Sequence, residues 1–193
     1  MNAGRIIAIV FLLEMALASL VFYGEGFTLT GLQTVTRFSG RLSLLIFSIL
    51  FLIHHKRGHI DTLLLGKPYH TFAFAHGIHL LELLLYIYLS AAPVVPVRMA
   101  GGFIAYLFIF LMPWLTARQE AGNLSPKLYA IIEKIFQYYT WLIFFMTYLP
   151  RVRGVMPHVG GTYREHVLLL GWVSLMMGMK ITGLLQFRSG TSR

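Results

Sequence analysis

The chain has 193 residues, of which 57% are hydrophobic and 12% are charged, and its mean hydropathy is +0.71. A soluble domain carries about 25% charged residues, so this composition indicates a membrane protein. A net charge of +9 fits contacts with lipid headgroups, because nucleic-acid binding would need a soluble basic face that the chain lacks. The absence of cysteine excludes disulfides, thiolate-bound clusters and covalently attached haem.

Six apolar runs are each close to the roughly 20 residues that a helix needs to cross the hydrocarbon core. In chain order they span residues 5–23, 38–54, 69–92, 98–115, 128–149 and 165–185. The connections between them are too short to fold as separate domains. The sequence therefore predicts an all-α fold, a polytopic six-transmembrane-helix bundle in which residues 1–193 form a single transmembrane domain.

Two of these runs contain features that bear on where a helix lies or ends. The run 5–23 could be a cleaved signal peptide, but its length and Glu14 favour a retained first helix. In the run 98–115, Pro113 is expected to bend or end the helix. In the sixth run, Gly171, Ser174 and Gly178 favour close packing against another helix.

The third run carries the most informative side chains, His76, His79 and Glu82. Their spacing of three places them along one side of a helix. Ionisable groups inside a membrane are costly and are therefore functional candidates. An imidazole pair at this depth indicates a metal or haem site, with His76 and His79 as the ligands.

Two further ionisable residues, Glu14 and Lys180, are expected at a similar depth in the first and last helices. A buried ammonium group requires an anion, so Lys180 is predicted to pair with Glu14, with Glu82 or with a carboxylate of a bound ligand. A bridge between Glu14 and Lys180 that only holds helices together is the main alternative to a ligand contact.

The other histidines are weaker candidates. His54, His55 and His59 lie together at the end of the second run, where a solvated turn is expected and zinc binding is a minor alternative. His70 is expected at the membrane interface. His166 starts the sixth run from the opposite face, too far in depth from His76 to share one macrocycle with it.

The distribution of basic residues over the two faces predicts the orientation. The face that includes both termini collects more of them and all of the loop lysines, namely Arg5, Lys56, Arg57, Lys67, Arg118, Lys127, Lys134, Arg188 and Arg193. The opposite face collects Arg37, Arg41, Arg98, Arg151, Arg153 and Arg164. Both termini are therefore expected in the cytoplasm, with the chain in the bacterial inner membrane.

Three segments carry a family resemblance: TRFSGRLSLLIFSILFLI from Thr36, FAFAHGIHLLELL from Phe72 and YYTWLIFFMTYLPR from Tyr138. Together they resemble the ferric reductase-like transmembrane domain family, in particular its short bacterial members that lack the flavin and nicotinamide domain. The resemblance implies a six-helix bundle that holds b-type haem between the third and fifth helices and passes electrons. His76 or His79 matches the family's ligand in the third helix.

The chain departs from the family pattern in the fifth helix. Five residues before the Tyr-Tyr pair, where similar proteins carry a histidine, stands Glu133. Three outcomes remain open: haem on one histidine, haem with a ligand from another subunit, or a haem-free protein. A second haem would need histidines about 13 residues further along, where the chain has Leu89 and Ala92, so one haem b is the maximum.

Two functional classes follow. The first is an electron-transfer membrane protein with haem at His76 or His79. The haem propionates would be near Arg41, Lys180 or Arg37. Because the sequence has no dinucleotide fingerprint, the electron donor would be a quinol or a separate redox protein. The second is a haem-free accessory subunit of a larger membrane complex. Proton transport through Glu14, Glu82 and Lys180 is a weaker third idea, because these groups alone make no continuous relay.

Overall fold

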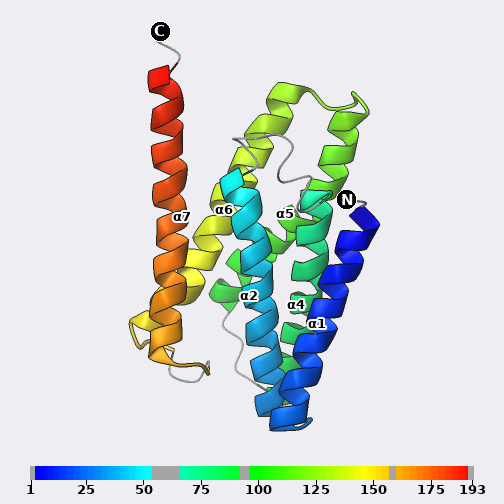
Figure 1. Cartoon of the computed structure of the whole chain (residues 1–193), viewed down its shortest axis with the longest axis vertical. Coiled ribbons are helices and arrows are strands. Elements are labelled where there is room, and N and C mark those ends of the chain that lie inside the picture. Colours follow the sequence, from blue (N-terminus) through cyan, green and yellow to red (C-terminus); the bar gives the residue numbers. More distant parts are fainter. Residues whose placement is uncertain (1–2, 54–65, 92–95, 157–159, 191–193) are drawn as a thin grey trace.

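In the computed structural model of the protein, the described residues are 3–53, 66–91, 96–156 and 160–190. They form six helices, α1 (Ala3–Glu25), α2 (Leu29–Ile53), α4 (Pro68–Ser90), α5 (Pro96–Glu120), α6 (Pro126–Val152) and α7 (Tyr163–Gly190), and no strand occurs in this part of the chain. The helices run up and down in turn, so α1 starts and α7 finishes toward the same end of the bundle (Figure 1). The predicted all-α six-helix bundle is confirmed.

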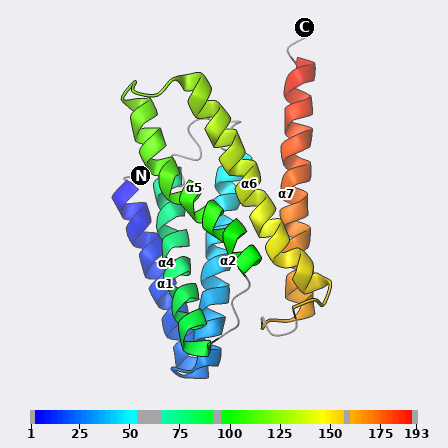
Figure 2. The ribbon, with the colours of Figure 1, turned by 180° about the vertical axis from the view of Figure 1, so that it is seen from behind.

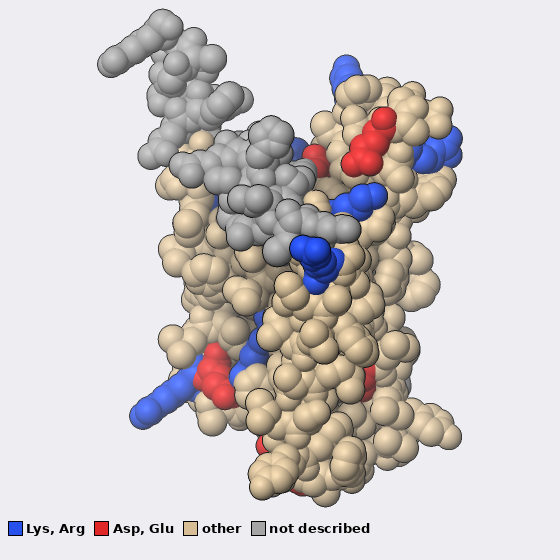
Figure 3. Space-filling model, turned by 45° about the vertical axis from the view of Figure 1, so that its right-hand side comes forward, with Lys and Arg blue, Asp and Glu red and all other residues tan. Residues whose placement is uncertain are grey.

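Five of the six helices, α1, α2, α4, α5 and α7, are long and apolar enough to cross a membrane. The sixth, α6, is the second longest at 27 residues, but it interleaves polar side chains such as Glu133 and Gln137 with its apolar ones. Lys, Arg, Asp and Glu lie mainly toward the two ends of the molecule, and the surface between them is formed by other residues (Figure 3). This belt has the form expected of a protein surrounded by lipid.

The first helix shows the membrane character most directly, because its polarity is inverted relative to a helix in water. Leu12 and Leu20 are 64% and 74% exposed, whereas the carboxyl group of Glu14 is enclosed in the bundle, with 2% of the residue exposed. In water the exposed leucines would cost free energy and the buried carboxylate would cost more. Lipid removes the first cost, so the structure supports an integral membrane protein.

The centre of the bundle is α2, which packs against α1, α4 and α7. The next layer is formed by α4 against α1 and α5, and by α6 against α5 and α7 (Figures 1 and 2). Phe47, Leu50 and Phe51 of α2 are completely buried and anchor this core. Because α1 and α7 lie on opposite sides of α2, side chains of these two helices do not meet.

Two helix boundaries differ from the prediction. The second helix starts at Leu29, nine residues before the apolar run at residue 38, directly after a tight turn in which Gly26 has φ +72°. From Gly31 onward most residues of this segment are buried among the neighbouring helices, and Thr34 and Thr36 donate to Glu25 and to the carbonyl of Leu32. The fourth predicted helix does not end at Pro113 but continues to Glu120. Membrane helices tolerate an internal proline, since adjacent groups satisfy the freed carbonyl.

Candidate functional site

His76 lies on the inner side of α4, where only 9% of the residue is exposed. Its Nδ1 is 2.6 Å from the hydroxyl oxygen of Ser43 on α2. The imidazole centroid is 5.3 Å from the ring of Phe72, 4.8 Å from Tyr106 and 5.9 Å from Phe144. A proton on Nδ1 would be donated to Ser43, which fixes the ring and leaves the lone pair of Nε2 for a ligand.

His79 lies one turn further along α4, with its ring centroid 5.4 Å from that of His76. The backbone carbonyl of Thr36 accepts a hydrogen bond from this imidazole, and its Nδ1 is buried with no hydrogen-bond partner in the described part of the chain. Gly40 of α2 faces the ring: a Cβ there would lie 3.0 Å from Cε1 of His79. The missing side chain at Gly40 therefore makes the space that the imidazole occupies.

Glu82 continues the same side of α4 and meets Glu14 across Ser39. The Ser39 hydroxyl donates to Oε1 of Glu14 at 3.1 Å and lies close to the Glu82 carboxyl group. The other carboxyl oxygen of each glutamate is buried, and among the described residues it has no hydrogen-bond partner. Through Ser39 the two acids connect α1, α2 and α4, and such polar contacts between helices stabilise a membrane bundle.

The prediction that Lys180 pairs with Glu14 or Glu82 is wrong. Its ammonium group donates to the carbonyl oxygen of Phe51 and, at 3.0 Å, to Oε1 of Gln137. The reason is the arrangement of the helices, since α7 packs on α2 and α6, while α1 and α4 lie on the far side of α2. Lys180 therefore links α2, α6 and α7 and lies apart from His76, His79 and Glu82 of α4.

Arg41 and Glu133, which a haem could use as a propionate partner or an axial ligand, are both bonded to other side chains of the chain. Arg41 forms an ion pair with Glu165 at 3.0 Å, so its guanidinium group is not held free for a propionate. Glu133, at the position where the resemblance implies a second haem ligand, accepts a hydrogen bond from the Tyr69 hydroxyl. This bond joins α4 to α6 and gives Glu133 a structural role.

These positions were only partly foreseen from the sequence. The structure brings His76, His79 and Glu82 together as predicted, and it separates Lys180 from them. Sequence reasoning missed Ser39 and Ser43, the α2 hydroxyls that contact Glu14 and the His76 imidazole. Their spacing of four, which puts both on one side of α2, was the signal available.

The side chains able to ligate a metal determine which cofactors the site could hold. In the described part of the chain no three His, Cys, Asp or Glu side chains converge as a metal site, and His54, His55 and His59, the minor zinc candidates, lie outside the described residues. A b-type haem needs one or two axial ligands and an apolar surround. Two buried imidazoles and the aromatic rings around them supply one axial ligand type and an apolar surround from the α4 side, but Phe47, Phe72 and Phe144 pack against one another beside His76, so a haem would have to displace them.

Comparison of the chain with protein-family models, with curated proteins and with solved structures gives no match. The function therefore has to be argued from the site itself.

Proposed function

We propose that the chain is an integral membrane electron-transfer protein that binds a single b-type haem through His76. The observation that carries this proposal is the hydrogen bond of 2.6 Å between Nδ1 of His76 and Ser43, in a site enclosed by aromatic rings. Haem ligands in proteins are held in this way, with the second ring nitrogen bonded to a fixed acceptor. The resemblance in three segments of the sequence points to the same class.

Each residue of the site then has a part that its contacts support. Ser43 orients the ligating imidazole through its contact with Nδ1. His79 donates to the Thr36 carbonyl, and its buried, unpartnered Nδ1 can accept a hydrogen bond beside the proposed haem. Bound haem would supply a reversible one-electron carrier, and the surrounding Phe72, Tyr106 and Phe144 would keep water away from it.

The proposal also includes an electron donor and an orientation in the membrane. No nucleotide-binding fingerprint occurs in the sequence, so a quinol or a separate redox protein delivers the electron. The excess of basic residues on the face that includes both termini supports a location of the termini in the cytoplasm of a bacterium. Because the chain has no cysteine, single cysteines at Gly4 and Gly154 test this orientation by labelling: we expect Gly4 to react from the cytoplasm and Gly154 from outside, and the reverse pattern contradicts it.

Absorption spectroscopy of single variants tests the haem site. We expect His76→Ala to abolish the haem bands and His79→Ala to shift the potential or weaken binding by about 10- to 100-fold. Glu133→His should leave the coordination number unchanged, because Glu133 bonds to Tyr69, about two helical turns before His76. His70→Ala, on the same helix but nearer its end, is the matched control and should leave the spectrum unchanged. Unchanged haem bands in both His76→Ala and His79→Ala would overturn the proposal.

A haem-free accessory subunit is the second candidate, and two observations favour it. Phe47, Phe72 and Phe144 pack against one another beside His76, so haem would have to displace rings that already fill the core. On α7, Gly171 and Gly178 have open space where a Cβ would stand, which leaves a surface for close packing with another membrane helix. Purification with an associated membrane protein, and without haem, would select this candidate.

A further inference from the structure

Three arginines from two helices meet at the end of the bundle opposite the chain termini. Arg37 and Arg41 are one turn apart on α2, and Arg151 lies in the last turn of α6. Arg151 is close enough to interact electrostatically with both of the others. Its guanidinium carbon lies 5.6 Å from the centroid of the Tyr148 ring, and that of Arg41 lies 4.8 Å from the Phe38 ring. We call these three residues the arginine cluster.

The charge of the arginine cluster is only partly balanced. Arg41 pairs with Glu165 at 3.0 Å, the one ion pair within the described ranges of the chain. Nε of Arg37 and Nε of Arg151 are buried and have no hydrogen-bond partner in the same ranges. His166, of which 6% is exposed, adds a buried Nδ1 that is also unpartnered. Buried guanidinium groups with open donors require an anion.

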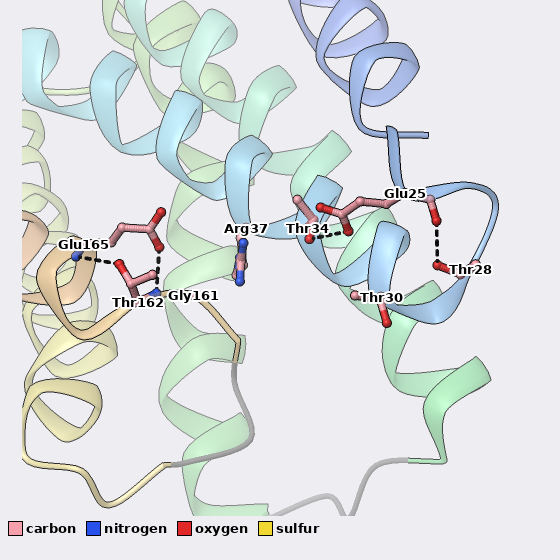
Figure 4. Close-up of a pocket in the computed structure, with 8 residues that line it drawn as sticks. All are labelled: Glu25, Thr28, Thr30, Thr34, Arg37, Gly161, Thr162 and Glu165. Atoms are coloured by element: carbon pink, nitrogen blue, oxygen red, sulfur yellow. Dashed lines mark hydrogen bonds between the residues drawn. The ribbon is translucent and has the colours of Figure 1, made fainter. Parts of the chain in front are cut away.

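A pocket of about 680 Å³ opens beside Arg37, with walls from the start of α2 and the start of α7. Figure 4 shows Arg37 between a wall formed by Gly161, Thr162 and Glu165 and a wall that carries Glu25 and Thr34. Hydroxyl groups of four threonines and two carboxylates complete the lining: Thr28, Thr30, Thr34, Thr162, Glu25 and Glu165.

Both carboxylates of this pocket have hydrogen-bonding partners. Glu165 accepts from Arg41 and, at 3.0 Å, from the backbone N–H of Thr162, while Glu25 accepts from the Thr34 hydroxyl at 3.0 Å. Three guanidinium charges against these two carboxylates leave one positive charge. Arg37 is the member of the arginine cluster that lines the pocket, and Arg151 acts on it through its charge, while Arg41 is paired with Glu165.

The depth of the arginine cluster indicates which anion is at hand. Arg151 is one residue from the end of α6, and Glu165 and His166 lie in the first turn of α7. Arg37 lies near these helix ends, because it interacts electrostatically with Arg151 and Glu165. Helix ends mark the border between hydrocarbon and headgroups, where phosphate is the common anion.

We propose that the arginine cluster and the pocket beside Arg37 bind the phosphate group of an anionic phospholipid. Guanidinium groups match phosphate oxygens through paired N–H donors, and basic pockets between membrane helices are known to hold such headgroups. The threonine hydroxyls would donate to the remaining headgroup oxygens. This inference does not depend on haem, because it uses residues at the end of the bundle and none of the α4 histidines.

Lipid binding to the full chain, stripped of lipid in a non-ionic detergent and free of added haem, tests the proposal. The probes are dioleoylphosphatidylglycerol, dioleoylglycerol with the same acyl chains but no phosphate, and sodium phosphate. Native mass spectrometry measures retention of each lipid. We expect the phosphatidylglycerol to bind about tenfold more tightly than dioleoylglycerol. Equal binding of the two lipids, or displacement of the lipid by millimolar sodium phosphate, would overturn the proposal.

Substitutions locate the site. The combined variant Arg37→Gln and Arg151→Gln should lose the preference for phosphatidylglycerol, to within about twofold of dioleoylglycerol. Arg153 and Arg164 are exposed arginines of the same end, so Arg153→Gln with Arg164→Gln is the matched control and should keep it. Equal loss in both pairs would show a nonspecific charge effect and reject the site.

Two further experiments, crosslinking and haem competition, test the lipid site independently of these variants. If the combined variant does not fold, a phosphatidylglycerol with a photoreactive headgroup is crosslinked to the wild-type chain, and the label should map to residues 33–41 or 148–165. Labels only elsewhere would reject the site. If haem addition displaces the lipid from the wild-type chain, the anion held there is a propionate and the lipid proposal fails, whereas a chain that binds no haem but retains the lipid overturns only the proposed function.

Discussion

Loss of the hydrogen bond between Ser43 and His76 should lower the free energy of unfolding by an amount that can be worked out from the structure. Ser43→Ala removes the partner of an imidazole nitrogen that is buried among aromatic rings. Polar bonds between membrane helices average about 0.6 kcal/mol, because unpaired groups usually find another partner. Here the rings of Phe72 and Phe144 beside the imidazole carry no polar group, so we expect a penalty nearer that of a buried unpaired group, about 1–3 kcal/mol.

Reversible unfolding in mixed micelles measures this cost on the haem-free protein. Ser174→Ala is the matched control, because Ser174 is exposed and its hydroxyl donates to the carbonyl of Leu170 in its own helix. A double-mutant cycle with His76→Phe sharpens the test. Once the imidazole is gone, Ser43→Ala should cost less than about 0.5 kcal/mol. Equal destabilisation by Ser43→Ala with and without the imidazole would refute the reasoning.

Three more outcomes follow from the contacts. Gly40→Leu should destabilise the bundle by about 1–3 kcal/mol, because a Cβ at Gly40 would lie 3.0 Å from the His79 imidazole. Gly102→Leu is the control and should be tolerated, because open space surrounds that position. Equal destabilisation by the two substitutions would contradict the prediction. The coupling energy of Arg41→Gln with Glu165→Gln should stay below about 1 kcal/mol, since the two side chains are 21% and 36% exposed, and a double-mutant cycle measures it. Lys180→Met should lower the free energy of unfolding by about 1–3 kcal/mol, as two acceptors lose a donor, and an unchanged unfolding curve would be inconsistent with that role.

Most of the fold could be predicted because apolar run length is a strong signal in membrane helices. The start of α2 could not, since Thr34 and Thr36 look like part of a polar connection until their neighbours are known. These side chains are buried because α2 is surrounded by other helices, and a helix in that position can bury small polar groups that bond to its own carbonyls or to facing helices. Run length carries no information about such surroundings.

The candidate site divides in the same way. The α4 histidines could be found from spacing within one helix, and Glu14 was expected inside the membrane for its charge. The partner of Lys180 depends on which helices are neighbours, and periodicity within one helix does not determine that. The arginine cluster was missed for the same reason, because Arg37 and Arg151 are far apart in the sequence and meet only where α2 lies beside the end of α6.

The proposal that His76 holds one haem is tested most directly by the haem content of the wild-type chain. The protein is saturated with haem in detergent, and free haem is then removed. The reduced-minus-oxidised spectrum and the pyridine haemochrome assay together give the type of haem and the amount per chain. We predict b-type Soret and alpha bands at one haem per chain, a stoichiometry set by the single histidine-bearing stripe of α4. A chain that retains no haem under these conditions contradicts the account and leaves the accessory-subunit function in its place.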